Sequence, residues 1–184
     1  MLFSPRTYRV ASTVPDLALL NGVVAPEILS AMRSASSQLA RTGVRHALIG
    51  ALAVGAWGYP RASKDVDFLV GDEAFERHEA GIVTLLPGVP IGAGGIPIDH
   101  VGILPHEKHL DDILTGLMGS DLLPIAPLEA LVYLKLKSPR RRDAADVVEL
   151  LRINEPGPVR DYLERNAPDL LAKFDQIAAE ATAD

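Results

Sequence analysis

The chain has 184 residues, 48% of them hydrophobic and 23% charged, which favours a folded domain with a proper core over a disordered chain. Its formal net charge of −6 excludes a protein that coats nucleic acid nonspecifically, because such binding needs many cations on phosphates. No apolar run approaches the roughly 18 residues needed to span a bilayer. The N-terminus is unlike a signal peptide, and zero cysteines exclude disulfides and thiolate metal sites. We therefore expect a cytoplasmic protein with no membrane partner.

The first part of the chain alternates helix and strand patterns. Residues 1–24 show little periodicity and are predicted to be an N-terminal extension, with a short helix near Asp16 to Leu20. Apolar positions three or four residues apart predict an amphipathic helix from Pro26 to Arg41, with the proline in its first turn. The next expected elements are a strand over His46–Ile49, a short helix over Ala51–Trp57 and a strand over Val66–Val70.

The middle of the chain contains a glycine-rich segment between two expected elements. We predict a helix from Asp72 to Leu86, which ends before Pro87-Gly88. Strand positions then run from Ile96 to Ile103. The Gly-x-Gly-Gly sequence at Gly92 to Gly95 suggests a nucleotide-binding loop, but no helix follows it, so we interpret it as a hairpin loop.

The last third is predicted to be helical. Prolines, acidic residues near expected N-termini and apolar spacing define four segments: Pro127–Lys137, Asp143–Arg152, Val159–Arg165 and Pro168–Ala179. The predicted organisation is a core over residues 25–126 and a C-terminal helical region over residues 127–184 that packs on it.

Three aspartates are the strongest candidates for chemistry. Asp65 and Asp67 are two residues apart on an expected strand, so their side chains point to one face. Asp99 lies in an otherwise apolar strand. An unpaired carboxylate there costs free energy, so its presence indicates a functional role. Magnesium takes one or two carboxylates plus substrate phosphates, and a third carboxylate allows two metals about 3.5 to 4 Å apart. The pattern predicts a site for Mg²⁺ or Mn²⁺.

The turn at Gly50-Ala51 lies directly before an expected helix. Backbone N–H groups at a helix start are unpaired, and the dipole there favours an anion. Small side chains allow close backbone approach, so this turn is predicted to hold phosphate.

Residues 46–70, from Gly50-Ala51 through Arg61-Ala62-Ser63-Lys64-Asp65-Val66-Asp67, resemble the signature of the nucleotidyltransferase superfamily typified by DNA polymerase beta. Within it, the chain is most similar to small bacterial toxins of abortive-infection toxin–antitoxin pairs. Leu128-Glu129-Ala130 to Lys135, then Arg142-Asp143 and Asp146, resembles the family's helical segment. The match covers roughly residues 46 to 150. It implies an α+β fold, with a mixed sheet flanked by helices and a helical C-terminal part.

The resemblance also implies residue roles. The expected metal ligands and catalytic residues are Asp65, Asp67 and Asp99, and the expected nucleotide-binding residues are Gly50, Ala51, Arg61, Lys64 and Lys135. Many active members have Gly-Ser or Gly-Gly where this chain has Gly50-Ala51, so a serine contact to phosphate is missing.

The implied activity is metal-dependent transfer of a nucleoside monophosphate from a nucleoside triphosphate, such as ATP, to a hydroxyl acceptor. That acceptor is RNA such as tRNA, a protein or a small molecule, and an antitoxin is an expected partner. The alternative is a catalytically weak nucleotide-binding or protein-interaction module. Ala51 and the absence of a broad basic surface motivate it.

Several polar residues have a structural alternative. Arg61 could pair with Asp65 on the surface, and Lys135 could pair with Asp146. Five cations between Lys135 and Arg142 form either a local basic site or a solvated helix end whose cations compensate the dipole.

Aromatic and histidine residues near these motifs are less informative. Trp57 and Tyr59 could stack on a base or belong to the core. His106 and His109 are weakly zinc-like, but the charged surroundings favour an exposed loop. His100 should face away from Asp99, because neighbouring strand residues point to opposite faces.

Overall fold

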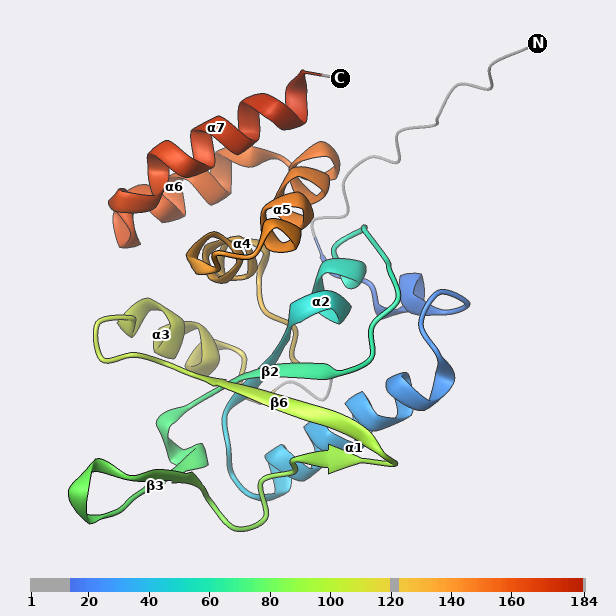
Figure 1. Cartoon of the computed structure of the whole chain (residues 1–184), viewed down its shortest axis with the longest axis vertical. Helices are drawn as coiled ribbons and strands as arrows, with labels where there is room; N and C mark the ends of the chain where they lie inside the picture. The colour runs from blue at the N-terminus through green and yellow to red at the C-terminus, as the bar shows by residue number, and fades with distance from the viewer. Residues whose placement is uncertain (1–13, 120–122, 184) are drawn as a thin grey trace.

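The computed structural model describes residues 14–119 and 123–183 and has an α+β fold, as predicted (Figure 1). The described helices are α1 (Pro26–Arg41), α2 (Gly50–Ala56), α3 (Lys108–Gly116), α4 (Leu128–Lys137), α5 (Arg141–Ile153), α6 (Pro156–Asn166) and α7 (Leu171–Thr182). The described strands are β1 (His46–Ile49), β2 (Val66–Val70), β3 (Phe75–Arg77), β4 (Val83–Leu85), β5 (Gly92–Ala93) and β6 (Ile96–Gly102). Short 3₁₀ turns are η1 (Leu17–Leu20), η2 (Asp72–Ala74), η3 (Glu79–Gly81) and η4 (Pro168–Leu170). Residues 1–13 of the predicted extension and the last residue of the predicted helical region lie outside the described residues.

The main sheet is mixed, with the strand order β1-β2-β6-β5 among the described residues. β1 runs antiparallel to β2, whereas β2 and β6 are parallel. In this register Asp67 of β2 lies beside Asp99 of β6 and beside Ile49 of β1. The topology therefore brings two of the three predicted aspartates next to each other, although 32 positions separate them in the sequence.

Helices cover the sheet on two sides (Figure 1). α1 contacts all four strands of the main sheet from one side, while α2 packs on β1 and β2 and also touches α4. The C-terminal helices α4 to α7 contact one another and gather on the side away from α1. Among the described residues, no helix combines the length and the apolar character needed to cross a membrane.

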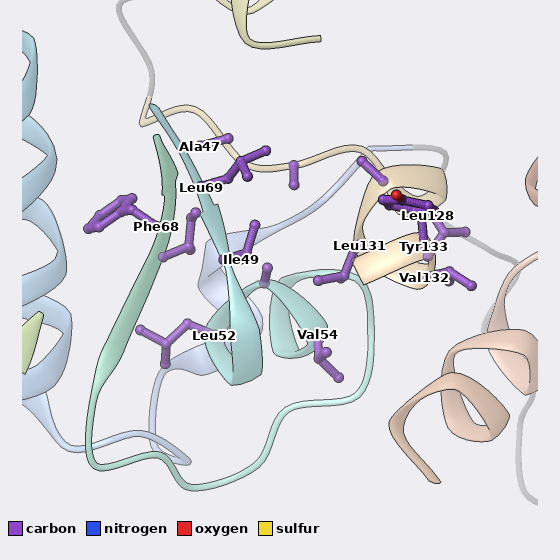
Figure 2. Close-up of a cluster of buried hydrophobic side chains, with 14 of the residues drawn as sticks. Ala47, Ile49, Leu52, Val54, Phe68, Leu69, Leu128, Leu131, Val132 and Tyr133 are labelled. Atoms are coloured by element: carbon purple, nitrogen blue, oxygen red, sulfur yellow. The ribbon is translucent and has the colours of Figure 1, made fainter. Parts of the chain in front are cut away.

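The core joins the central strands to α2 and α4, as Figure 2 shows. Leu52 of α2, Phe68 of β2 and Leu131 of α4 are each less than 2% exposed. Burying a side chain of this size contributes about 1.5 to 3 kcal/mol. This packing holds α4 against α2, and with it the polar residues at the end of α4.

Local pattern predicts the first half of the fold well. The predicted helix Pro26–Arg41 has the observed bounds of α1, and its buried face includes Ile28, Met32, Ala35 and Leu39. The predicted strands His46–Ile49 and Val66–Val70 are β1 and β2, and the predicted short helices correspond to η1 and α2. The glycine-rich segment is a hairpin between β5 and β6, with Gly94 and Gly95 at positive φ.

The predicted helix from Asp72 to Leu86 is wrong. This segment forms the β3–β4 hairpin between two 3₁₀ turns, and Phe75 pairs with Leu85. Ala80 and Gly81 have φ of 62° and 77°, a left-handed backbone that ends any right-handed helix. The β-branched residues that follow favour a strand.

The C-terminal region is helical, as predicted. Before it, α3 begins inside the segment around His106 and His109 that we interpreted as an exposed loop. His106 is exposed in a turn, whereas His109 lies in α3 and packs between Tyr133 and Tyr162. Glu107, before the helix, is almost fully buried and accepts hydrogen bonds from Tyr133 and Lys137. The loop prediction is therefore correct for His106 and wrong for His109.

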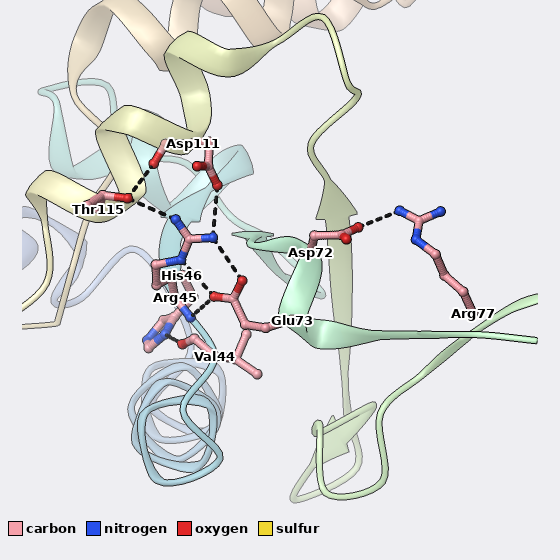
Figure 3. A network of polar contacts seen from close by, with 8 residues as sticks. All are labelled: Val44, Arg45, His46, Asp72, Glu73, Arg77, Asp111 and Thr115. Carbon is pink, nitrogen blue, oxygen red and sulfur yellow. Dashed lines mark hydrogen bonds and ion pairs between the residues drawn. The ribbon is translucent and has the colours of Figure 1, made fainter.

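A polar network fastens the start of β1 to η2 and α3 (Figure 3). The Arg45 guanidinium donates to both carboxylate oxygens of Glu73 at 2.9 Å and pairs with Asp111 at 2.9 Å. Burial alone would raise the pKa of Glu73, but the hydrogen bonds from Arg45 outweigh it and hold that pKa below its usual value. By contrast, the nearby pair of Asp72 and Arg77 is largely exposed and contributes little.

Candidate functional site

A cavity of about 780 Å³ opens between the sheet, the β1–α2 turn, the segment before β2 and the α4–α5 turn. Its lining includes every residue that the sequence singled out for metal or nucleotide: Gly50, Ala51, Arg61, Lys64, Asp65, Asp67, Asp99 and Lys135. These residues come from four separate stretches of the chain. The fold therefore places all of them around one space.

The carboxylates of Asp65, Asp67 and Asp99 gather at the sheet wall of this cavity. Asp67 and Asp99 are register partners on parallel strands, so their side chains point to the same face. Asp65 lies two residues before Asp67 and shares that face. Burial, followed by the negative charges of Asp65 and Asp99, raises the pKa of Asp67 to about 6. The Asp67 carboxylate is thus electrostatically strained by burial and by its two acidic neighbours.

The donor chemistry of this cluster suits a hard divalent cation. All the candidate ligands are carboxylate oxygens, and Mg²⁺ binds through one or two carboxylates together with substrate phosphates and water. Within residues 14–119 and 123–183, no three acidic or histidine side chains form a preassembled metal cluster. Two carboxylates plus ligand oxygens fit these residues better than an all-protein cage. A cation would also relieve the repulsion around Asp67.

Gly50 is fixed by its contact with Asp67. Its φ is +66°, and a Cβ at this position would lie 1.9 Å from Oδ2 of Asp67. No side chain fits in that space, so the backbone of the turn packs directly on the carboxylate. The following helix α2 has only seven residues, and Ala51 in its first turn is buried.

The cations Arg61 and Lys135 are held by acidic residues of α5. Arg61 donates to both oxygens of Asp146, at 3.0 and 2.8 Å. The ammonium of Lys135 donates to Asp143 at 2.5 Å and to Asp146 at 2.8 Å. The alternative that Lys135 pairs with Asp146 is confirmed, whereas the observed partner of Arg61 is Asp146 rather than Asp65.

This four-residue cluster of two cations and two carboxylates is internally neutral. Burial raises the pKa of Asp143, but hydrogen bonds from Lys135 and Ser138 outweigh it and hold that pKa below the usual value. Asp146 is only 2% exposed. Three members of this charge-balanced cluster, Arg61, Lys135 and Asp143, line the same cavity as the sheet carboxylates.

Further polar residues that were not among the predicted site residues line the same cavity: Ser63, Ser138, Arg140, Arg142 and Asp143. Ser63 donates to Oδ1 of Asp65 at 2.9 Å and so orients that carboxylate. The basic stretch from Lys135 to Arg142 was visible in the sequence, but the pattern did not say which of its members face the cavity.

No protein-family model matches this chain, and no curated protein matches it either.

The aromatic residues near the motif belong to the fold rather than to the cavity wall. Trp57 donates its indole N–H to the carbonyl of Ala126 at 2.9 Å, and both Trp57 and Tyr59 pack against the core. His100 is not part of the cavity lining that includes Asp99, as the alternation of strand side chains predicts. Its buried Nε2 has no hydrogen-bond partner among the described residues.

Replacing Gly50 by alanine should destabilise the protein by about 2 to 4 kcal/mol. About 1 to 2 kcal/mol comes from the left-handed backbone and the rest from displacement of Asp67. Gly43 is a matched control, because its φ is +73° and a Cβ there would meet nothing within 4 Å. Urea unfolding should give a loss of only about 1 kcal/mol for Gly43→Ala. Equal losses for the two variants would show that the contact with Asp67 is unimportant.

Proposed function

We propose that this protein is a metal-dependent nucleotidyltransferase that moves a nucleoside monophosphate from a nucleoside triphosphate to a hydroxyl acceptor. The observation that carries the proposal is the convergence of Asp65, Asp67 and Asp99 on one cavity whose lining also includes Arg140 and Arg142. Its volume, about 780 Å³, is in the usual range for small-molecule sites. The resemblance of residues 46–70 to the nucleotidyltransferase signature supports the same activity.

In this proposal Asp65 and Asp67 hold the metal, and Ser63 keeps the Asp65 carboxylate in place. A bound Mg²⁺ or Mn²⁺ supplies positive charge to the phosphate oxygens and to the attacking and leaving oxygens. Asp99, which is exposed at the cavity, accepts the proton of the acceptor hydroxyl. The acceptor oxygen forms a bond to the α-phosphorus, the bond to the bridging oxygen breaks, and pyrophosphate leaves.

The acceptor class is RNA such as tRNA, a protein or a small molecule. Within the proposed family the protein acts as a toxin in the cytoplasm, and a cognate antitoxin is its partner. The absence of cysteine in the sequence is compatible with a reducing compartment.

Transfer of label from each nucleoside triphosphate, with Mg²⁺ or Mn²⁺ and candidate acceptors, tests this function. We expect transfer by the wild type and a decrease of at least about 100-fold in Asp65→Asn, the size of effect seen when a key charge-stabilising group is removed. Asp72→Asn, which alters an exposed carboxylate outside the cavity, should retain full activity. Absence of transfer with every nucleotide and acceptor class would reject the proposal.

The second candidate is a nucleotide-binding module without turnover. Its supporting observation is that Arg61 and Lys135 are already neutralised by Asp143 and Asp146, so neither brings a full charge to a transition state. Calorimetry separates the two candidates. Nucleotide affinity that is independent of Mg²⁺ and unchanged by Asp65→Asn favours the binding module.

A further inference from the structure

Two arginines of the α4–α5 turn line the cavity opposite the sheet carboxylates. Arg140 precedes α5 and Arg142 lies in its first turn; both are exposed and both belong to the cavity lining. Arg141, between them, does not belong to that lining. Two of three consecutive arginines therefore border the space where a ligand would lie.

The position of these arginines does not fit a solvated helix end that compensates the dipole. Lys137 is in the last turn of α4, where a cation is favourable. The arginines lie at the N-terminus of α5, where the helix dipole is already positive and a cation is unfavourable. That interpretation is correct for the lysine and wrong for the arginines, so the basic turn needs another explanation.

The charge distribution in the cavity also sets these arginines apart. The charges of Arg61 and Lys135 are balanced by Asp143 and Asp146. No carboxylate within salt-bridge distance accompanies Arg140 or Arg142 among the described residues.

Arg140 shares the cavity lining with Asp67 of β2 and Asp143 of α5. An anion between this turn and the sheet would therefore lie within reach of Arg140.

We propose that Arg140 and Arg142 bind the terminal phosphates of the nucleotide. Arg61 and Lys135 instead stabilise the cavity wall through their ion pairs with Asp143 and Asp146. The guanidinium group suits this role because its planar N–H donors match phosphate oxygens two at a time. The inference rests on the proposed function for the identity of the ligand. It adds that the ligand class is a polyphosphate chain, held between the sheet carboxylates and the α4–α5 turn.

Recognition of the polyphosphate chain predicts selectivity for nucleoside triphosphates over monophosphates. A monophosphate next to the sheet carboxylates has no terminal phosphates for the arginines to bind. Affinity for ATP should therefore depend on both arginines, whereas affinity for AMP should not. Inorganic tripolyphosphate should behave like ATP, because the arginines contact no base.

Calorimetric titration of the 184-residue chain with tripolyphosphate, ATP and AMP tests this inference. Arg140→Ala and Arg142→Ala should each weaken tripolyphosphate and ATP binding at least about tenfold, the effect of losing a charge-assisted hydrogen bond. Arg141→Ala is the matched control and should change the affinity less than about threefold. Arg140→Lys, which keeps the charge but loses the planar fork, should be intermediate. Titrations in magnesium buffer and in EDTA should give the same ranking.

The outcomes separate this inference from the proposed function. Equal affinities for Arg140→Ala and Arg141→Ala, or no binding of tripolyphosphate by the wild type, overturn the role of the arginines. If the arginine variants lose affinity as expected but no nucleotide is transferred to any acceptor, the phosphate site stands and only the transferase proposal fails. Circular dichroism of each variant confirms that the exposed substitutions leave the fold intact.

Discussion

Replacing Asp67 by asparagine should abolish nucleotide transfer and, at the same time, make the metal-free protein more stable at pH 8. The stability gain follows from burial and from the charges of Asp65 and Asp99, which raise the pKa of Asp67 to about 6 from 3.8. A shift of that size corresponds to about 3 kcal/mol, and we expect about 2 kcal/mol because the side chain keeps some contact with water. An acidic residue that is present although its charge destabilises the folded protein is typical of a functional site.

The sign of the pH dependence follows from proton binding. Between pH 4 and pH 6 the folded wild type holds the Asp67 proton more tightly than the unfolded chain does, so the free energy of unfolding decreases as the pH rises. Below about pH 4 Asp67 is protonated in both states, and above about pH 6 the full penalty is present. Asp67→Asn removes this contribution at every pH.

Urea unfolding in EDTA at pH 4, 6 and 8 measures this effect. The difference between Asp67→Asn and wild type should be near zero at pH 4 and reach about 2 kcal/mol at pH 8. Asp72→Asn is the matched control, because that carboxylate is 67% exposed and should change stability by less than about 0.5 kcal/mol. A variant of Asp67 that is less stable than wild type at pH 8 would contradict the electrostatic strain at Asp67.

Local sequence pattern was sufficient to predict an element whose structure depends mainly on its own residues. The bounds of α1 follow from Pro26 and from apolar residues on one helical face, and they need no knowledge of the rest of the fold. The hairpin of β3 and β4 shows the limit. Its Glu- and Ala-rich composition favours a helix, while the left-handed backbone at Ala80 and the pairing of Phe75 with Leu85 decide for strands.

The sequence grouped the three aspartates and anticipated the pair of Lys135 with Asp146, but it did not nominate Arg140 or Ser138 or anticipate the partner of Arg61. Asp65, Asp67 and Asp99 could be grouped because strand periodicity and a resemblance pointed to one face. The binding of Arg61 by Asp146 connects residues 85 positions apart and depends on how α5 packs. No local pattern contains that information. Thus the sequence could nominate Arg61 for phosphate, but only the fold shows that its charge is already balanced.

Replacing Asp146 by alanine should destabilise the protein by about 3 kcal/mol. Breaking a buried ion pair costs about 3 to 5 kcal/mol, and the lower value applies here because Lys135 keeps its bond to Asp143. The melting temperature should decrease by about 6 to 12 °C for a chain of this length. Asp175→Ala is the matched control, because its pair with Arg160 is about half exposed and its loss should change the melting temperature little.

A double-mutant cycle tests whether the stability lost in Asp146→Ala comes from leaving the Arg61 guanidinium without its partner. The double variant Asp146→Ala, Arg61→Ala should lose less stability than the sum of the single variants, because no unpaired guanidinium is then left at the wall. Denaturant unfolding gives the coupling, and calorimetry with ATP gives the binding effect in the same variants. If Arg61→Ala lowered ATP affinity but left both the stability and the coupling to Asp146 unchanged, Arg61 would be a phosphate ligand. The proposal that Arg140 and Arg142 bind the phosphates while Arg61 is only part of the neutral ion-pair cluster would then be wrong.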